Sequence, residues 1–370
     1  MLVSGFNGFG QFRGGRKLQK FEDTIVESAD NVSRDILLSC SWSCTAFAYD
    51  NNLYLKGFFA EKTNNCRKLT TTENIKSLAL NDRFCLVLLN NGKLYKLNLS
   101  IDSVLEELKF TLDNQIAPQK RSIFGECKSK SSFSLEIAFV ACGNNITVAI
   151  SNNNVVFNGI TQAYEFPQHM HTKELQCGFE HAVLLNTNGD IFTWGNGWRG
   201  QLGQAILGRH ETPTIVDALA GLKIISIAAG GWHSAAISAF GDLYTWGFNS
   251  NGQLGLRVFK NSSSLIKEPS VYPLPQIIDL PECICSQSVD TDDSTVSCAP
   301  FKVLAGGRHT LIIKNCGALF ACGWNAHSQL GLTSDRDYVD NLQYVLSISK
   351  HLMESKVYCG SWCTIIKNNS

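Results

Sequence analysis

The stretch "AGGWHSAAISAFGDLYTWGFNSNGQLG" at residues 229–255 contains the pattern that decides the fold. It opens with small residues and a histidine, and an apolar run then leads to a polar turn that contains glycine. A second apolar and aromatic run ends at Trp-Gly, and the stretch closes with Gln-Leu-Gly. Two short runs of β-forming residues joined by a tight glycine turn predict a β-hairpin.

The same template recurs along the chain. Two stretches match it closely, "CGFEHAVLLNTNGDIFTWGNGWRGQLG" at 177–203 and "AGGRHTLIIKNCGALFACGWNAHSQLG" at 305–331. Weaker copies occupy 39–58, 80–98 and 141–159. A last copy, "YCGSWCTIIKNNS" at 358–370, has the first strand and stops where the turn should follow. The opening words "MLVSGFNGFGQ" supply the missing second strand and tail, so one unit is divided between the two ends of the chain.

The spacing of the copies predicts a closed ring. Seven copies begin near Ser41, Asn81, Gly143, Gly178, Gly230, Gly306 and Gly360. The step from Gly360 through the C-terminus to Ser41 is 51 residues, close to the 52 between Gly178 and Gly230. A repeat of this length that closes head to tail is typical of a β-propeller. We therefore predict an all-β fold in which residues 1–370 form one seven-bladed β-propeller, closed by pairing of the N-terminal strand with the C-terminal strands.

The outer strands and the inserted segments can also be located. "TPTIVDALAG" at 212–221 and "YPLPQIIDLP" at 272–281 contain proline, which belongs on an edge strand because it cannot donate to the ladder. Counting the N-terminal part-copy as the first repeat, inserted loops fall at 257–271 and 282–300, between the sixth and seventh repeats. A further long loop spans 99–133, where "DSVLEELKFTL" predicts a short surface helix. Such loops either bind partners or have no role of their own.

Composition excludes several classes of protein. Hydrophobic residues make up 44% of the chain and charged residues 17%, which excludes wholesale disorder. Lys plus Arg and Asp plus Glu both number 32, and this balance argues against direct DNA binding. We find no signal peptide and no apolar run long enough to span a bilayer. With 14 cysteines and no export signal, we expect a reduced nuclear or cytoplasmic protein.

The histidines and cysteines that could serve in catalysis or metal binding occupy structural positions of the repeat. His181, His233 and His309 share one repeat position, and other copies fill it with Cys44, Phe84, Ile146 and Cys363. A position that accepts Phe and Ile is a core position, so we expect buried histidines bonded to loop backbone. Cys40, Cys142, Cys177 and Cys359 occupy the small opening position, one per blade, which favours packing over metal binding. The role of Cys283, Cys285 and Cys298 in the inserted loop stays open.

No catalytic or nucleotide-binding motif is recognisable. "GQLG" lacks the Lys-Ser/Thr of a P-loop, and no nucleophile elbow or metalloprotease motif occurs. We therefore expect no enzyme activity, no cofactor and no resident metal.

The repeat frame resembles the regulator of chromosome condensation repeat family. The matching positions are the histidines and the Trp-Gly and Gly-Gln words: His181, His233, His309, Trp194, Trp246, Gly5, Gly10 and Gln11. The resemblance implies a monomeric chromatin-linked adaptor whose partner is a Jumonji-type histone-modifying oxygenase, histones, or both. The alternative that it implies is guanine-nucleotide exchange on a small GTPase, although no stretch matches the loop or hairpin wedge that the exchange factors use.

The residue just before the histidine position is our candidate for recognition, because it precedes the same strand in every blade. A ring around one end of the central channel should result. This residue is Ser43, Arg83, Asn145, Glu180, Trp232, Arg308 or Trp362, and Trp42 stands beside Ser43. The candidate partner-binding residues are Trp42, Arg83, Glu180, Trp232, Arg308 and Trp362, with Asp290, Asp292 and Asp293 from an inserted loop. Trp and Arg exposed together are typical binding anchors. The alternative is that the tryptophans pack between blades.

Overall fold

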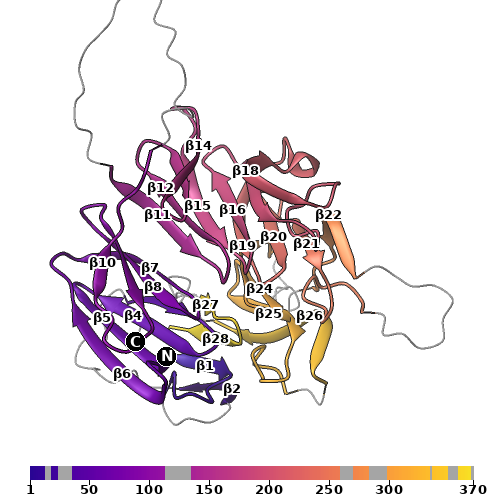
Figure 1. Ribbon diagram of the computed structural model, residues 1–370. Helices are drawn as coiled ribbons and strands as arrows, with labels where there is room; N and C mark the ends of the chain where they lie inside the picture. The colour runs from indigo at the N-terminus through magenta and orange to yellow at the C-terminus, as the bar shows by residue number, and fades with distance from the viewer. Residues whose placement is uncertain are drawn as a thin grey trace, which may run out of the picture.

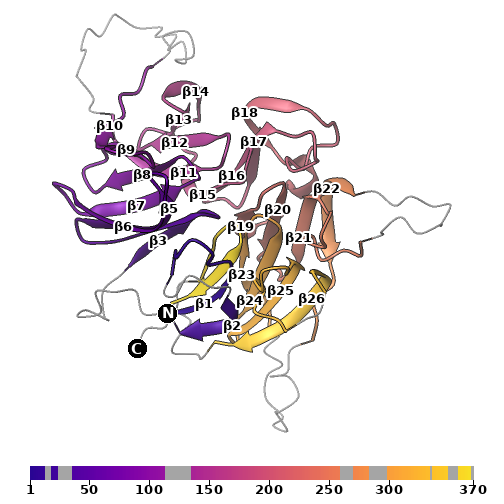
Figure 2. The same cartoon turned by 60° about the horizontal axis from the view of Figure 1, so that its bottom comes forward.

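A computed structural model describes residues 1–12, 18–23, 36–112, 135–258, 270–282, 298–333, 336–348 and 357–367. These residues form seven four-stranded antiparallel sheets, the blades of a β-propeller. Figure 2 shows the blades following one another around a central axis in chain order. The predicted all-β, seven-bladed architecture is confirmed. We call the four strands of a blade A to D, from the innermost to the outermost.

The strands of each blade, in the order A to D, are as follows. Blade 1 has β27 (Val357–Cys359), β28 (Cys363–Ile366), β1 (Leu2–Gly5) and β2 (Leu18–Asp23). Blade 2 has β3 (Leu37–Cys40), β4 (Cys44–Tyr49), β5 (Asn52–Phe59) and β6 (Lys62–Thr70). Blade 3 has β7 (Ile75–Leu80), β8 (Phe84–Leu89), β9 (Leu94–Asn98) and β10 (Leu105–Glu107). Blade 4 has β11 (Ile137–Cys142), β12 (Thr147–Ser151), β13 (Val155–Asn158) and β14 (Thr161–Glu165).

The last three blades contain the strongest repeats. Blade 5 has β15 (Thr172–Cys177), β16 (His181–Asn186), β17 (Ile191–Asn196) and β18 (Arg209–Ile215), followed by the 3₁₀ turn η1 (Asp217–Leu219). Blade 6 has β19 (Ile224–Ala229), β20 (His233–Ser238), β21 (Leu243–Phe248) and β22 (Val271–Ile278). Blade 7 has β23 (Pro300–Ala305), β24 (His309–Lys314), β25 (Ala318–Trp324) and β26 (Tyr338–Ser347). Among the described residues, no helix has the length and apolar character needed to cross a membrane.

The hydrophobic core is divided among the blade interfaces. The described residues form seven buried clusters, and each cluster joins two neighbouring blades. Each blade thus buries one face of its sheet against the blade before it and the other face against the blade after it, which is how a propeller without a single central core is held together. The A strands contact one another around the ring.

Closure of the ring uses both ends of the chain. β1 pairs with β28 in the register Leu2 with Ile366, Val3 with Ile365 and Gly5 with Cys363. β2 then adds the outer strand of the same blade. Figure 1 shows the indigo β1 beside the yellow β28. The sequence prediction that one blade is shared between the two ends is therefore confirmed.

The predicted surface helix within 99–133 is wrong. Leu105–Glu107 form β10, which pairs with β9 and completes blade 3. The spacing of Leu105, Leu108 and Leu112 imitates a helix, but the unpaired edge of β9 gains hydrogen bonds only from an extended partner. Leu105 packs on the cluster between blades 2 and 3, whereas Leu108 packs on the cluster between blades 3 and 4.

The proline-containing stretches lie in outer strands, as the sequence predicts. Pro213 is in β18, and Pro273 and Pro275 are in β22, which are the outermost strands of blades 5 and 6. The proposed inserted loops 257–271 and 282–300 lie mostly outside the described residues. Their last residues, Val271 and Pro300, already belong to β22 and β23.

Candidate interaction surface

The turns that join A and B strands place the predicted ring residues around one mouth of the central channel. The lining of that channel, whose volume is about 430 Å³, reaches Gly231, Gly307 and Ser361, each of which directly precedes a ring residue. Backbone hydrogen bonds connect these turns to one another. The Phe179 N–H donates to the Gly231 carbonyl at 3.0 Å, and the Gly307 N–H donates to the Ser361 carbonyl at 2.9 Å. The ring positions are therefore held on a rigid frame.

A second hydrogen bond ties each ring position to the C strand of its own blade. The residue that follows the Trp-Gly glycine donates its N–H to the carbonyl of the ring residue. The pairs are Phe6 with Trp362, Phe58 with Ser43, Phe248 with Trp232 and Trp324 with Arg308, at 2.8 to 2.9 Å. The same bond joins Leu99 to Arg83 at 2.8 Å and Asn196 to Glu180 at 2.9 Å, so the donor is aromatic in blades 1, 2, 6 and 7 but not in blades 3 and 5. In those four blades the backbone bond places an aromatic side chain next to the ring position.

In blades 6 and 7, the residue before that donor must be glycine because strand C passes very close to the AB turn there. Gly247 has φ +107°, and a Cβ atom there would lie 2.5 Å from the Trp232 carbonyl oxygen. At Gly323, with φ +112°, the Arg308 carbonyl oxygen would lie 2.4 Å away. Neither obstacle is a flexible side chain, so only glycine lets strand C approach the AB turn this closely.

Gly247→Ala should therefore lower the free energy of unfolding by about 3 kcal/mol or more, because it adds both a disfavoured φ and a backbone clash. Gly208→Ala is the matched control, since a Cβ at Gly208 meets nothing within 4 Å and its φ is not in the left-handed region. Urea unfolding of both variants measures the difference. Equal urea midpoints for the two variants would show that the close approach of strand C to the AB turn does not affect stability.

In blades 1, 6 and 7, two buried amide side chains fix the loop between the C and D strands. In blade 6, the Asn249 Oδ1 accepts from the Leu254 N–H at 3.2 Å and the Gln253 Oε1 accepts from the Asn251 N–H at 2.8 Å. Blade 7 repeats the arrangement with Asn325 and Gln329. Blade 1 repeats it with Asn7 and Gln11, supplied by the N-terminus. The Gly-Gln words thus shape a rigid loop.

AB turns and CD loops lie at the same end of their blades, because successive antiparallel strands alternate in direction. We call this end the AB/CD face and the other end the BC/DA face. Aromatic rings gather on the AB/CD face in a continuous set that we call the aromatic arc. Its members are Phe58, Phe9, Trp42, Trp362, Phe6, His327 and Trp324, and neighbouring ring centroids are 5.0 to 5.5 Å apart.

The arc crosses the closure of the ring. Phe6 and Phe9 come from the N-terminus, Trp42 and Phe58 from blade 2, and Trp324 and His327 from blade 7, while Trp362 comes from the C-terminal part of blade 1. Trp362 lies at its centre and contacts four of the other rings. Phe58 is exposed and the other members are half-buried. The rings of Trp42 and Trp362 contact each other across the boundary between blades 1 and 2, which agrees with the alternative that the tryptophans pack between blades.

Two arginines continue the surface beyond the arc. The Arg308 guanidinium carbon lies 5.8 Å from the ring centroids of both Trp324 and Trp232. The Arg199 guanidinium carbon lies 4.2 Å from the Trp232 centroid and 4.9 Å from that of Phe248. Trp232 is half-buried and packs edge-on against Phe179. We call Arg199, Trp232 and Arg308 the arginine bracket.

Exposed apolar side chains are concentrated on the same face. Of twelve exposed large hydrophobic residues among those described, seven lie at or beside CD loops: Phe58, Ile101, Val104, Ile160, Trp198, Ile206 and Leu207. Ile206 is 81% exposed and Trp198 is 64% exposed. On the BC/DA face, the turn between β20 and β21 exposes Phe240. Exposed apolar surface concentrated in this way is typical of an interaction site.

The remaining predicted recognition residues lie apart from the arc. Arg83 and Glu180 line a separate pocket of about 510 Å³ beside blades 3 to 5. There Arg83 donates to the Asn144 carbonyl, and the Asn145 amide donates to the Glu180 carboxylate at 3.2 Å. Asp290, Asp292 and Asp293 lie outside the described residues.

The three repeat histidines are fully buried between blades. The expectation that they bond loop backbone is wrong, because each Nε2 meets a hydroxyl of the next blade. The partners are Ser234 for His181 at 2.9 Å, Thr310 for His233 at 2.9 Å and Thr364 for His309 at 3.4 Å. Each hydroxyl donates in turn to the backbone carbonyl of a glutamine, as Thr310 does to Gln253 at 2.7 Å, so the histidine must be the donor. Trp194 and Trp246 are fully buried as well.

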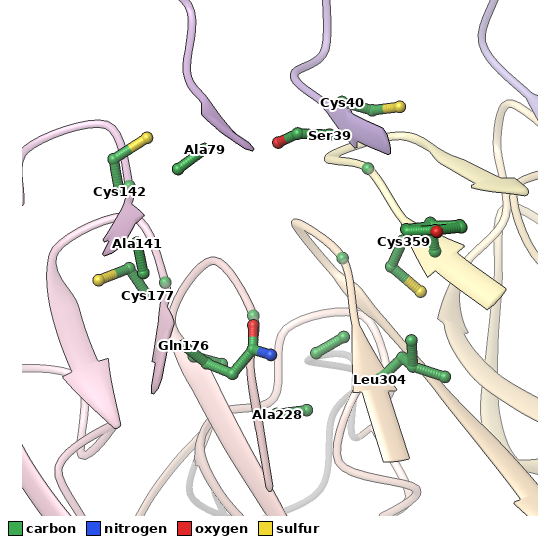
Figure 3. Close-up of a pocket in the computed structure, with 18 of the residues that line it drawn as sticks. Ser39, Cys40, Ala79, Ala141, Cys142, Gln176, Cys177, Ala228, Leu304 and Cys359 are labelled. Carbon is green, nitrogen blue, oxygen red and sulfur yellow. The ribbon is translucent and has the colours of Figure 1, made fainter. Parts of the chain in front are cut away.

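Four cysteines are among the residues that line the central channel. Figure 3 shows Cys40, Cys142, Cys177 and Cys359 on four different strands around it. Burial raises the pKa of each of these thiols, to about 12 for Cys142, so they stay protonated at neutral pH. Among the described residues, no group of three or more His, Cys, Asp or Glu is placed to hold a metal ion. Cys298 packs on the cluster between blades 6 and 7, whereas Cys283 and Cys285 lie outside the described residues.

Comparison with known proteins identifies the repeat. The family described as "Regulator of chromosome condensation (RCC1) repeat" matches at residues 188–237 and 241–313. A second description of the same repeat matches at 173–201 and 224–253. Residues 173–313 therefore contain RCC1 repeats. Blade 1, which the family match does not cover, shows the same glycine approach and the same amide-locked loop, with Gly5, Asn7 and Gln11.

Relatives of this chain include RCC1 domain-containing protein 1 from Homo sapiens and from Mus musculus. The human protein is 32% identical over 227 residues, which cover 53% of this chain and 56% of the relative. The mouse protein is 31% identical over 226 residues, which cover 53% and 55%. The chain thus matches a little over half the length of each relative. Among solved structures, Prp20p from Saccharomyces cerevisiae superimposes with a TM-score of 0.68 at 16% identity, over 99% of this chain and 90% of Prp20p, which supports the fold.

Several members of the surface were not among the predicted site residues. Phe6, Phe58, Phe248 and Trp324 share the position after the Trp-Gly glycine, and an alignment of the RCC1 repeats at that position would have found them. Arg199 is different, because it belongs to the CD loop "GWRGQLG" and occupies no ring position. Nothing in the repeat frame indicates that its side chain reaches the Trp232 of the next blade.

Proposed function

We propose that this RCC1-repeat propeller is a non-enzymatic binding scaffold that recruits a protein partner on its AB/CD face. The observation that supports the proposal is the gathering of the aromatic arc, the arginine bracket and most exposed apolar side chains on that one face. Trp and Arg are the residue types that most often dominate binding energy at protein interfaces. The rigid AB turns and CD loops hold these side chains in place, which lowers the entropic cost of binding.

We propose further that the partner is chromatin-associated, either a histone or a Jumonji-type histone-modifying oxygenase. Prp20p, whose fold this chain shares, has been described with binding properties to Gsp1p and histones, so this class of partner is a reasonable first choice. Guanine-nucleotide exchange on a small GTPase is the competing function. It requires a surface that displaces a nucleotide, and accelerated nucleotide release by the purified protein would favour it.

Affinity purification of the tagged full chain from nuclear extract, followed by mass spectrometry, tests the proposal. Trp232→Ala with Arg308→Ala should reduce recovery of the partner by about tenfold or more, because two anchors are lost. Phe240→Ala is the matched control, since it removes an exposed aromatic ring from the BC/DA face. Recombinant histones and the purified oxygenase then show whether binding is direct. Unchanged recovery with the folded double variant, or loss with Phe240→Ala alone, would contradict an AB/CD partner site.

A further inference from the structure

The arginine bracket has two cationic groups, and no acidic side chain pairs with them among the described residues. Arg199 and Arg308 approach the same indole, that of Trp232. Neither guanidinium has a carboxylate partner or a hydrogen-bond acceptor among the described residues. By contrast, Arg209 at the edge of the same face has its Nε 2.6 Å from a Glu211 carboxylate oxygen. Each guanidinium has five N–H donors in a planar fork, and stacking on an aromatic ring satisfies none of them.

A planar anion is the group that this arrangement lacks. An acidic group beside the Trp232 indole would accept charge-assisted hydrogen bonds from the guanidiniums that approach this ring. Both arginines are half-buried, so these bonds would form in surroundings less polar than bulk water and would be stronger for it. Contact with the Trp232, Phe248 and Trp324 rings limits the positions of both side chains, which reduces the entropy that binding must remove.

The aromatic arc supplies an apolar neighbour for that anion. Arg308 contacts Trp324, and Trp324 contacts Trp362 at 5.5 Å. The path from Trp232 through Arg308 and Trp324 to Trp362 therefore consists of three contacts, each of less than 6 Å. An extended peptide of roughly five residues spans such a distance at about 3.3 Å per residue.

The geometry disfavours a cationic ligand. Rings that recognise a quaternary ammonium group surround it, whereas the rings of the arc touch one another, as Trp42 and Trp362 do at 5.4 Å. The two arginines would also repel a cation. A nucleic acid is disfavoured by the charge balance of the chain, 32 basic against 32 acidic residues, since nucleic-acid surfaces are strongly basic.

We propose that the arginine bracket and the aromatic arc together bind an extended acidic segment of a protein partner. Asp or Glu carboxylates of the segment pair with Arg199 and Arg308 beside Trp232, and an aromatic or aliphatic side chain about five residues away lies on Trp324 and Trp362. This inference rests on the proposed function, because it gives the chemistry of the partner that the AB/CD face recruits.

Selection from a library of short random peptides displayed on phage tests it, with the full chain as bait. Peptides that bind should be enriched in Asp or Glu separated from Trp, Phe or Leu by about five residues. A synthetic peptide from the selection should bind about tenfold more weakly to Arg199→Gln or Arg308→Gln, and about 100-fold more weakly to the double variant. Arg209→Gln removes the same charge from the same face and should leave affinity unchanged. Trp324→Ala should remove the preference for the apolar residue and keep the preference for the acid.

Several results would overturn the acidic-segment assignment. They are selected peptides without acidic enrichment, affinity that the double arginine variant does not change, and selection of basic or methylated-lysine peptides. Tighter binding of a single-stranded DNA oligonucleotide, lost in the same variant, would assign the bracket to nucleic acid instead. A different result would contradict the proposed function and leave the peptide site intact. If partner recovery from nuclear extract is insensitive to Trp232→Ala with Arg308→Ala while the peptide still binds the bracket, the site exists but does not recruit that partner.

Discussion

Lowering the pH from 7.5 to 5 should reduce the free energy of unfolding by on the order of 6 kcal/mol through the three buried histidines alone. Burial lowers the pKa of His181 and His233 to about 3 and that of His309 to about 4, and the nearby His181 and His309 also lower the pKa of His233. In the unfolded chain a histidine has a pKa of about 6.5.

The sign of the effect follows from proton binding. Between about pH 6.5 and pH 4 the unfolded chain binds a proton at each of these histidines and the folded chain does not, so acid favours unfolding. The stabilisation is complete above pH 6.5 and is lost as the pH falls toward the folded-state values. At pH 5 each histidine contributes a loss of about 2 kcal/mol.

His309→Cys isolates the contribution of one histidine. Cysteine is a natural occupant of this repeat position, as Cys44 and Cys363 show, so the blade interface should tolerate it. Urea unfolding at both pH values should show a loss smaller by about 2 kcal/mol than in the unsubstituted chain, whatever the variant does to stability at pH 7.5. His181→Cys combined with His309→Cys should reduce the loss by about twice as much. An equal loss in all three proteins would show that other groups cause the acid lability.

The sequence predicted the ring and its closure because the signals involved are local. Gly5, Asn7 and Gln11 are recognisable at the N-terminus since each has a backbone or amide role that only one or two residue types can perform. The broken copy at 358–370 then defines which half of a blade is missing. The histidine position was predictable as buried for the same reason. Its hydroxyl partner was not predicted, although Ser234 and Thr310 follow the histidine of the next repeat directly.

The aromatic arc could not be predicted from the repeat alone, because its members come from different repeat positions. Trp42 and Trp362 belong to AB turns, whereas Phe9 and His327 belong to CD loops. Their contacts depend on how neighbouring blades meet, and the sequence does not encode that angle in any local signal. The error over Leu105–Glu107 has a similar origin, since pairing with β9 outweighed a helical pattern of leucines.

Val3→Asp should open the ring, at a cost of about 4 kcal/mol or more in the free energy of unfolding. Val3 is fully buried in β1, with β28 on one side and β2 on the other. It packs in the cluster between blades 1 and 2, which has the fewest buried members of the seven clusters. A carboxylate there would lose its water and would separate the strand that closes the ring. Val104→Asp makes the same change at a side chain that is 64% exposed and should have little effect. Limited proteolysis and urea unfolding compare the two variants. If both unfold at the same urea concentration, pairing of the two chain ends does not hold the propeller closed.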